Sequence, residues 1–453
     1  MMGTHRMVAL GMAAMLSVVA ARPRTRNDAV PTAGAGTPAP ATRCPAGGLV
    51  VPAGAALQAV LDGSTPGTVL CLSPGRYDGP VEIHTRLTLI GPADAVLHSN
   101  GTGTTLRVLA DSAEVRGFTV DGSGRRYDKM DAAVYLRGDG TQALGLTVRN
   151  ALFGIVAEQS NGVTIADNHI AGLAELPVGI RGDGIRLWEV RRSSVARNRL
   201  TDSRDIVVWY SPNNRIVGNT VVGSRYATHF MYSDDCLVEG ADYRGNIVGV
   251  FVMYSRGITL RADTIANNTF ADGLGLGVKE SGNLTVEDSH FINDRDCLYL
   301  DTSPFREGDT VLVRGNTFAG CNAAVTFHSS EQNNAFRDNT FYGNQTQVAV
   351  EGRGTAQDVV WHGNYFDDYT GYDLNGDGTG DVPYELRDFS ERLVSNHPQL
   401  AFFRGSVVFA VLDATAHVFP LLQPETLLTD PAPRMAPAGT DCIAASDNRC
   451  ASN

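Results

Sequence analysis

Histidine and methionine residues recur in a repeated segment of the 453-residue sequence. The copies THFMYSD and VFVMYSR place His229, Met231 and Met253 in two neighbouring repeats. A histidine with two thioethers suits the soft ion Cu(I), because imidazole and thioether donors select copper over hard cations. We therefore predict a copper contact at these three residues, with His328 of a later copy as a weaker candidate. Core packing is the alternative, since methionine fills gaps in cores and a histidine beside apolar residues is usually structural.

Oxygen ligands for a harder ion gather in a second segment, DLNGDGTGD, at residues 373–381. Its polar side chains alternate along the chain: Asp373, Asn375, Asp377, Thr379 and Asp381. This spacing is typical of a Ca²⁺ loop in which Gly378 supplies the sharp turn. The twelfth position is Tyr384 rather than glutamate, so a helix-flanked EF-hand is not matched. A turn held by its own Asp and Asn hydrogen bonds is the alternative to Ca²⁺ binding.

A repeat indicates which elements position these residues. From residue 163 onward, a β-branched or apolar residue and two variable residues are followed by Asn-x-apolar. The asparagines are Asn168, Asn198, Asn219, Asn316, Asn339 and Asn364, and degenerate copies carry Ala241, Asp263 and Ser289. Successive copies lie 21 to 30 residues apart, and short strands with Gly, Asn and Asp turns at this period predict a solenoid. We predict an all-β, right-handed parallel β-helix over residues 44–385, with the asparagines in left-handed turns and joined in a hydrogen-bonded ladder.

Such a solenoid arranges side chains in columns. Residues one period apart stack at about 4.8 Å, and alternate residues point inward or outward. With the copies aligned on a recurrent Ser corner, the inward column should be Val208, Phe230, Val252, Leu300 and Phe327. The outward column should be Trp209, Met231, Met253, Lys279, Asp301 and His328. A further column beside it should be Val207, His229, Phe251 and Tyr299.

Sugar chemistry is a second interpretation of this face, because parallel β-helices often house polysaccharide lyases, hydrolases and epimerases. The acid–base candidates are Tyr226, His229, Asp234 and Asp235, together with Asp205 or Asp301. A third interpretation is a non-catalytic sugar-binding platform, in which pyranose rings stack on Trp209, Tyr299 and Phe251. A passive, adhesin-like solenoid would bind neither metal nor sugar. The net charge of −12 argues against nucleic acid as a partner, because such proteins carry a basic face.

The two ends of the chain depart from the repeat. Residues 1–21 combine a short basic start with an apolar stretch, which predicts a cleaved signal peptide, and residues 22–43 read as a Pro/Ala/Thr-rich linker. Residues 386–435 include the apolar segment SVVFAVLDATAHVFPLL, which polar residues and a proline interrupt, so it should not span a membrane. We predict that it forms a short irregular or helical cap on the open end of the solenoid. Residues 436–453 should form a flexible tail.

Export changes how the seven cysteines are interpreted. Two pairs are plausible disulfides in an oxidising compartment: Cys44 with Cys71, and Cys442 with Cys450. Cys297 and Cys321 are about one repeat apart and could stack on adjacent rungs. Cys236 is left over, either as a buried free thiol, which is favoured, or as an extra soft ligand.

Seven stretches occur together in a fixed order: GDGIRLW (182–188), RDIVVWYSPNNRIVGN (204–219), GSRYATHFMYS (223–233), GVFVMYSR (249–256), GLGVKES (275–281), LDTSP (300–304) and GNYFDDYTGYDLNGDGTGDVPY (363–384). This series resembles the NosD family over roughly residues 45–435. The single rungs are generic, but the ordered set is specific. Departures are modest: Phe366 stands where a tryptophan is expected, and Ala241 interrupts the asparagine series.

The resemblance implies a non-catalytic, periplasmic maturation factor for the copper–sulfide cluster of nitrous oxide reductase. Members of the family dock on an ABC transporter made of a membrane permease and an ATPase, and so associate with the inner membrane. A copper chaperone lipoprotein supplies the metal, which makes copper a cargo. The HFMYS and FVMYS motifs are where copper handling would fall, and residues 386–435 are the candidate segment for docking the permease. A carbohydrate-active enzyme, a uronan lyase or epimerase, is the alternative function.

Overall fold

The computed structural model describes residues 44–328, 332–351, 355–387, 393–394, 397–403, 406–418 and 426–437. The predicted signal peptide, the linker and the Cys442–Cys450 pair lie outside the described residues, as does most of the predicted tail. Contacts divide the chain into residues 1–40 and 41–453, and the fold below belongs to the second unit. Among the described residues, no helix combines the length and apolar character needed to cross a bilayer.

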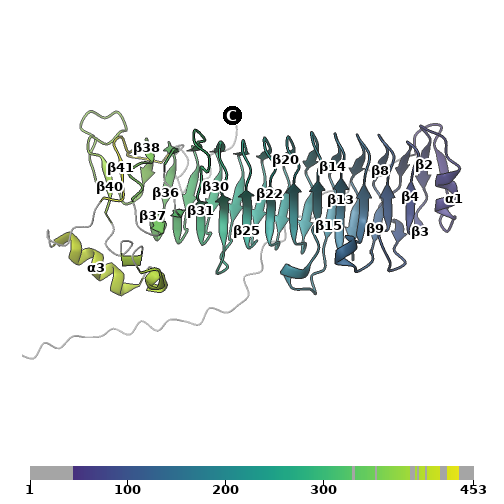
Figure 1. Cartoon of the computed structure of the whole chain (residues 1–453), viewed down its shortest axis with the longest axis horizontal. Coiled ribbons are helices and arrows are strands. Elements are labelled where there is room, and N and C mark those ends of the chain that lie inside the picture. The colour runs from purple at the N-terminus through teal and green to yellow at the C-terminus, as the bar shows by residue number, and fades with distance from the viewer. Residues whose placement is uncertain are drawn as a thin grey trace, which may run out of the picture. The chain divides into compact units, whose positions relative to one another are not determined.

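Three parallel sheets wind around one core in about 14 turns, which confirms the predicted parallel β-helix. Each turn adds one strand to sheet A, then one to sheet B and one to sheet C, and the strands follow one another in order along the axis (Figure 1). The handedness of the winding stays a prediction.

Sheet A contains β1 (Leu49–Val51), β2 (Val69–Leu72), β5 (Thr88–Ile90), β8 (Glu114–Arg116), β11 (Gln142–Leu144), β14 (Thr164–Ala166), β17 (Ser194–Ala196), β20 (Arg215–Val217), β23 (Leu237–Glu239), β26 (Thr259–Arg261), β29 (Leu284–Glu287), β32 (Val311–Arg314), β35 (Asn334–Arg337) and β38 (Val360–His362). Sheet B contains β3 (Gly75–Asp78), β6 (Ala95–His98), β9 (Thr119–Asp121), β12 (Thr147–Arg149), β15 (His169–Ala171), β18 (Arg199–Thr201), β21 (Thr220–Val222), β24 (Asp242–Arg244), β27 (Thr264–Ala266), β30 (His290–Ile292), β33 (Thr317–Ala319), β36 (Thr340–Tyr342) and β39 (Tyr365–Phe366).

Sheet C contains β4 (Val81–Ile83), β7 (Leu106–Val108), β10 (Ala132–Leu136), β13 (Phe153–Glu158), β16 (Ile185–Trp188), β19 (Asp205–Trp209), β22 (Tyr226–Met231), β25 (Val248–Met253), β28 (Leu274–Lys279), β31 (Asp296–Asp301), β34 (Ala323–His328) and β37 (Thr346–Glu351). The helical segments are α1 (Leu57–Asp62), η1 (Tyr127–Lys129), η2 (Val178–Ile180), η3 (Pro398–Phe403) and α3 (Val407–Val418). A separate antiparallel pair is formed by β40 (Tyr384–Leu386) and β41 (Leu428–Asp430).

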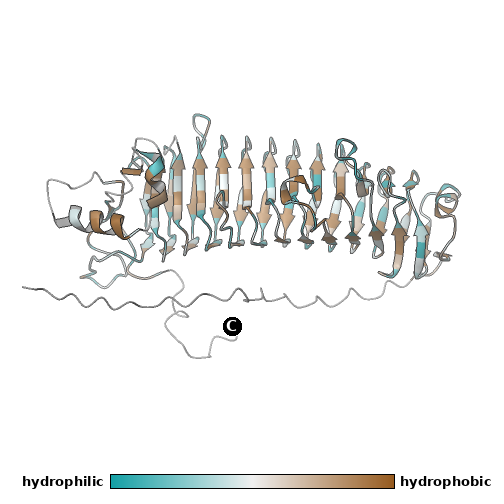
Figure 2. Cartoon of the chain, turned by 90° about the horizontal axis from the view of Figure 1, so that it is seen from below, coloured by the Kyte–Doolittle hydropathy of each residue, from teal (hydrophilic) through white to brown (hydrophobic). Residues whose placement is uncertain are grey.

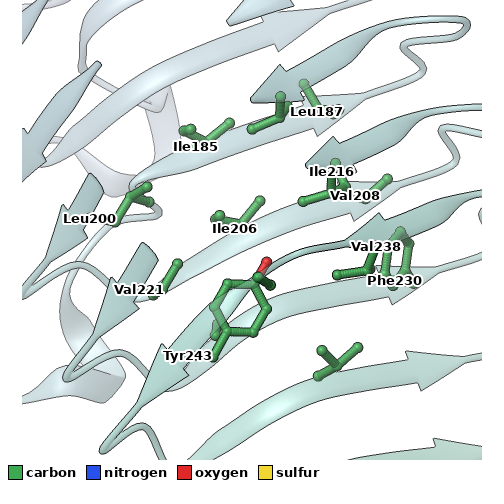
Figure 3. Packing of buried hydrophobic residues seen from close by; sticks show 14 of the residues in the cluster. Ile185, Leu187, Leu200, Ile206, Val208, Ile216, Val221, Phe230, Val238 and Tyr243 are labelled. Atoms are coloured by element: carbon green, nitrogen blue, oxygen red, sulfur yellow. The ribbon is translucent and has the colours of Figure 1, made fainter. Parts of the chain in front are cut away.

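The core is a continuous stack of inward-pointing apolar side chains (Figure 3). Ile185 of β16 is paired with Ile206 of β19, and Val208 of β19 with Phe230 of β22. The predicted inward column is confirmed, because all five of its members are fully buried. Stacking on this scale removes large apolar areas from water, which is the main favourable term in folding.

The predicted asparagine ladder is confirmed. The Asn168 amide donates to Oδ1 of Asn198 at 2.8 Å, and the Asn198 amide donates to Oδ1 of Asn219 at 3.0 Å. The expected left-handed conformation, however, lies one residue earlier, at Asp167 and Arg197, with φ of 58° and 53°. The residue before each asparagine adopts the left-handed conformation of the turn. The asparagine itself points its side-chain amide inward, where it reaches the asparagine of the next turn of the solenoid.

Aspartates replace asparagines in two buried ladders. Oδ1 of Asp263 accepts the backbone N–H of Ala241 at 2.8 Å, and Oδ1 of Asp294 accepts that of Asn268 at 2.9 Å in a second ladder. Burial raises the pKa of Asp263 to about 7 and that of Asp294 to about 8. A protonated carboxyl group has one donor and one acceptor, so it mimics the amide that it replaces.

Both ends of the described solenoid are covered. At the start, α1 packs against β4 and buries Leu57 and Leu61 in the core. At the other end, β41 places Asp430 against the last ladder residue, and its Oδ2 accepts from the Asn364 amide at 2.9 Å. Asp430 therefore ends the ladder with a carboxylate that needs no further partner along the axis.

Five of the seven cysteines lie in the described residues. Cys44 and Cys71 form a disulfide, as predicted. Cys297 and Cys321, expected to stack on adjacent rungs, also form one. Cys236 is a buried free thiol, and burial raises its pKa to about 12. A protonated, buried thiol is a poor ligand, so this finding disfavours the role of extra soft ligand.

Candidate metal centre

The outer face of sheet C carries the predicted columns. The register of successive strands aligns six residues in one column: Trp209, Met231, Met253, Lys279, Asp301 and His328. The neighbouring column contains Val207, His229, Phe251, Gly277 and Tyr299. A Cβ atom at Gly277 would lie 2.5 Å from the ring of Phe251, so glycine leaves the room that this ring occupies.

An extra residue in β22 brings two site residues to one face. Asp205 pairs with Tyr226 and Val207 pairs with His229, so two residues of β19 are matched by three of β22. In a regular strand, residues three apart point to opposite faces. The irregularity re-aims the chain, as β-bulges do, and the rings of Tyr226 and His229 meet with their centroids 4.9 Å apart.

His229 is the centre of the candidate site. Its Nε2 lies 3.4 Å from Sδ of Met253, and its Nδ1 accepts the indole N–H of Trp209 at 3.3 Å. Rings of Trp209, Tyr226 and Phe251 surround the imidazole, and only 5% of the residue is exposed. Burial lowers the pKa of His229 to about 4, so the imidazole is neutral at neutral pH. Because Nδ1 accepts from Trp209, the ring proton lies on Nε2, and a metal can bind at Nε2 only when this proton moves to Nδ1 and the Trp209 hydrogen bond is given up.

The separation of the two donor atoms suits one shared ion. Metal–nitrogen and metal–sulfur bonds of about 2.0 and 2.3 Å at a tetrahedral angle put the donors about 3.5 Å apart. Met231 is paired in register with Met253 on the adjacent strand, and both side chains are partly exposed. The structure thus gathers His229 and Met253 in direct contact, with Met231 one strand spacing away.

His328 stands apart from this group. It lies three strands beyond Met253, which corresponds to about 14 Å at the usual strand spacing. Its Nδ1 is 3.0 Å from Oε2 of Glu351, and its ring stacks on that of Tyr299. His328 therefore does not contribute to the His229–Met253 cluster.

A charged network beside His229 was not anticipated from the sequence. Asp205 is fully buried, binds Arg225 through both carboxylate oxygens, and has its Oδ2 3.9 Å from Nδ1 of His229. Asp183, also fully buried, contacts Arg186 at 2.8 Å and Arg204 at 3.3 Å. Burial raises the pKa of Asp183 to about 6, against the opposing effect of these arginines.

The network also reaches distant segments, since the Arg204 guanidinium donates to the hydroxyl of Tyr127 in η1. The sequence does carry one signal of this network. A Ser-Arg pair recurs directly before β19 and β22, at Ser203-Arg204 and Ser224-Arg225. The guanidinium groups of the three arginines pair with the buried carboxylates and also lie over aromatic rings.

The acid–base candidates are only partly assembled. Tyr226, His229 and Asp205 meet, and the Tyr226 backbone N–H donates to Oδ1 of Asp205 at 3.1 Å. Asp234 instead accepts the backbone N–H of Arg256 at a corner, and Asp301 pairs with Lys279 at 3.0 Å. Asp235, with φ of 54°, forms part of the same corner as Asp234.

The aromatic rings proposed as a sugar platform face their neighbours. The Arg186 guanidinium lies 4.8 Å over the ring of Trp209, and the ring of Phe251 stacks on the imidazole of His229. Tyr299 stacks on His328 in the same way. These contacts leave less ring surface for a pyranose than isolated exposed rings would offer.

The predicted Ca²⁺ loop is internally hydrogen-bonded. Asp373 accepts the backbone N–H groups of Gly376 and Gly378, at 2.6 and 2.8 Å, and Asp377 accepts that of Thr379 at 2.7 Å. Oδ2 of Asp381 accepts the backbone N–H of Leu374, and Asn375 donates to Asp377. The backbone bond lowers the pKa of Asp377. This is the Asx-turn arrangement, and Ca²⁺ binding stays a prediction.

Within the part of the chain that the structure describes, one cluster of His, Cys, Asp or Glu side chains has metal-like spacing. Ligand atoms of Asp294, Cys297 and Cys321 lie within 4.8 Å of one another. The two cysteines are joined in a disulfide, so they offer no thiolate to a metal.

Comparison with known proteins gives one family. Residues 171–371 match the family model of the periplasmic copper-binding protein (NosD). The "probable ABC transporter binding protein NosD" of Pseudomonas aeruginosa is 28% identical over 382 residues, which cover 78% of this chain and 85% of that protein. The protein of the same name from Stutzerimonas stutzeri is 27% identical over 384 residues, covering 78% and 83%.

Solved structures share the fold at low sequence identity. A GH87 α-1,3-glucanase from Streptomyces thermodiastaticus has a TM-score of 0.56 at 18% identity and covers 74% of this chain and 72% of its own. The A-module of the mannuronan C-5 epimerase AlgE6 from Azotobacter vinelandii has a TM-score of 0.52 at 16% identity, covering 67% and 93%. At these identities the likeness concerns the parallel β-helix alone.

Proposed function

This chain belongs to the NosD family of periplasmic copper-binding proteins, and we propose that it holds copper at His229 and Met253 as cargo for the maturation of nitrous oxide reductase. In this proposal the protein is exported by its signal peptide and handles the metal without catalysing a reaction. A copper chaperone lipoprotein would deliver the ion, and nitrous oxide reductase would receive it for its copper–sulfide cluster.

One observation carries the proposal: Nε2 of His229 lies 3.4 Å from Sδ of Met253. Imidazole and thioether are neutral, soft donors, a combination that favours Cu(I) over hard cations. The nearest carboxylate, Asp205, is already bound by Arg225, so it is not free to recruit a harder ion. The surrounding aromatic rings limit the access of water, which slows exchange of a bound ion.

Relatives named as ABC transporter binding proteins support a transporter partner. We place the contact with its permease, which works with an ATPase, on η3 and α3. Apolar side chains stand exposed there, with Phe402 88% and Val407 80% exposed, accompanied by Val408 and Val411. Helix α3 carries several hydrophobic residues in the colouring of Figure 2. Exposed apolar patches of this kind mark protein or membrane contacts.

The test is Cu(I) affinity, measured by competition with a chromogenic Cu(I) chelator under reducing conditions. His229→Ala and Met253→Ala should each weaken binding by more than about tenfold, because even outer-shell partners of a metal typically cost 10- to 100-fold. His290→Ala, an exposed histidine of sheet B, is the matched control and should bind as the wild type does. Unchanged affinity in both site variants would remove these residues from the proposal.

The assembly of Tyr226, His229 and Asp205 favours one second candidate, a carbohydrate-active enzyme that acts on uronans. A tyrosine, a histidine and a carboxylate within contact could exchange protons with a sugar ring. Its test is turnover of alginate or polygalacturonate by the wild-type chain and by Tyr226→Phe. Turnover that Tyr226→Phe abolishes would favour the enzyme, whereas no turnover by the wild type would leave the copper proposal as the better account.

A further inference from the structure

Three arginines surround the candidate copper site and outnumber their carboxylate partners. Ion pairs join Arg186 and Arg204 to Asp183, and Arg204 and Arg225 to Asp205. Three guanidinium groups thus face two carboxylates, which leaves one excess positive charge in the cluster. All five side chains are largely shielded, with the arginine side chains 12 to 26% exposed and both aspartates fully buried.

The excess charge lies close to the ligand pair. One aromatic ring separates Arg186 from His229: the guanidinium lies 4.8 Å over the Trp209 ring, whose indole N–H donates to Nδ1 of His229. Arg225 reaches the imidazole through Asp205 and through the ring of Tyr226, over which its guanidinium lies at 4.3 Å. These groups are largely buried, so their charges interact more strongly here than at the open surface.

We propose that the arginine cluster makes the site selective for monovalent copper, so that Cu(I) is held and Cu(II) is rejected. This inference rests on the proposed copper function and adds the basis of its valence selectivity. Repulsion between a fixed charge and an ion grows in proportion to the charge on the ion, so a divalent ion meets twice the penalty of a monovalent one. The neutral donors His229 and Met253 offer no anionic ligand to offset that difference.

The arginines also act by occupying the carboxylates. Asp205 would be a hard, anionic ligand within reach of His229 if it were free, and such a ligand would favour a divalent ion. Arg225 binds both of its oxygens. The cluster therefore disfavours Cu(II) twice, through excess charge and through the absence of a free carboxylate in the network.

The midpoint potential of copper bound to the full chain tests the proposal, because it reports the affinity for Cu(II) relative to Cu(I). Arg186→Met removes the charge and keeps an unbranched apolar side chain over the Trp188 and Trp209 rings. We expect Cu(II) to gain about three- to tenfold over Cu(I). The potential should then fall by about 30 to 60 mV, at 59 mV for each factor of ten. Arg186→Lys keeps the charge and should retain the wild-type potential.

Arg261→Met, which removes an arginine that pairs with Glu287 in sheet A, is the control and should leave the potential unmoved. An unmoved potential in Arg186→Met, or an equal fall in Arg186→Lys, overturns the inference. If Arg186→Met does not fold, Arg225→Met and Arg225→Lys replace the pair. Arg225→Met must lower the potential, because it also removes one of the two arginines that pair with Asp205.

The Cu(I) affinity of His229→Ala separates this inference from the proposed function. If His229→Ala binds Cu(I) as tightly as the wild type, both the copper site at His229 and the proposed selectivity are refuted. If His229→Ala weakens Cu(I) binding but Arg186→Met leaves the midpoint potential unchanged, the copper site stands and only the proposed selectivity for Cu(I) is refuted.

Discussion

Nε2 of His229 and Sδ of Met253 lie 3.4 Å apart on adjacent strands of sheet C, each donated by one copy of a repeated segment. Neither residue alone would hold a soft ion. Parallel stacking one period apart creates the pair, and the irregular register at the start of β22 aims His229 outward with Tyr226.

The two methionines should contribute unequally to copper binding. Met253 contacts His229, whereas Met231 is only its neighbour in the column. Met253→Leu should therefore weaken Cu(I) binding by more than about tenfold, while Met231→Leu has a smaller effect. Leucine conserves apolar volume, so packing changes little. Chelator competition on both variants is the measurement, and a larger loss in Met231→Leu would reverse the assignment.

The free energy of unfolding should fall as pH rises from about 4 to about 7. Asp263 has a pKa of about 7 in the fold and about 3.9 when unfolded, so between these values the folded chain binds more protons. Its contribution is full below about pH 4 and is lost as pH rises to about 7. Asp263→Asn should remove this loss and raise stability at pH 8 by about 2 to 4 kcal/mol.

Thermal unfolding at pH 5 and pH 8 measures this effect. Asp294→Asn, in the second ladder, should behave in the same direction. Equal differences in Tm between the two pH values for the wild type and Asp263→Asn would contradict the protonated-ladder account.

Removal of one ladder amide should be costly. The Asn198 side chain accepts from Asn168 and donates to Asn219 and to the Ile165 carbonyl, all in the core. Asn198→Ala leaves buried polar groups without partners, at a cost of about 1 to 3 kcal/mol for each such group. Exposed Asn100→Ala should be near neutral by comparison. Thermal unfolding distinguishes the two, and equal Tm values would refute a stabilising role for the ladder.

The apolar surface of η3 and α3 should govern attachment to the transporter. Val407→Asp combined with Phe402→Asp should abolish co-sedimentation with membranes that contain the permease and leave Cu(I) affinity intact. Tyr342→Asp changes another exposed apolar residue, in β36 of sheet B, and serves as the control. If the double variant still co-sediments with these membranes, the docking surface does not lie on η3 and α3.

The repeat made most of the fold predictable. A fixed period determines which residues stack, so the column of Trp209, Met231 and Met253 follows from the sequence. The asparagine ladder followed for the same reason. The left-handed residue was misplaced by one position, because the sequence marks the asparagine and not the residue that turns the corner.

The surroundings of the site were less predictable. Arg204 contacts Tyr127, 77 residues earlier, and no local pattern connects them. Strict alternation would also put Tyr226 and His229 on opposite faces, so their contact depends on a register change that the repeat does not encode. A shared copper contact of His229, Met231 and Met253 from two neighbouring columns was predicted, but the burial of His229 among aromatic rings was not.

X-ray absorption at the copper edge of the Cu(I)-loaded chain tests the central claim most directly. The account predicts a first shell with nitrogen at about 2.0 Å and sulfur at about 2.3 Å, with the nitrogen contribution reduced in His229→Ala and the sulfur contribution reduced in Met253→Leu. A shell of oxygen and nitrogen alone, unchanged in both variants, would contradict copper binding at His229 and Met253.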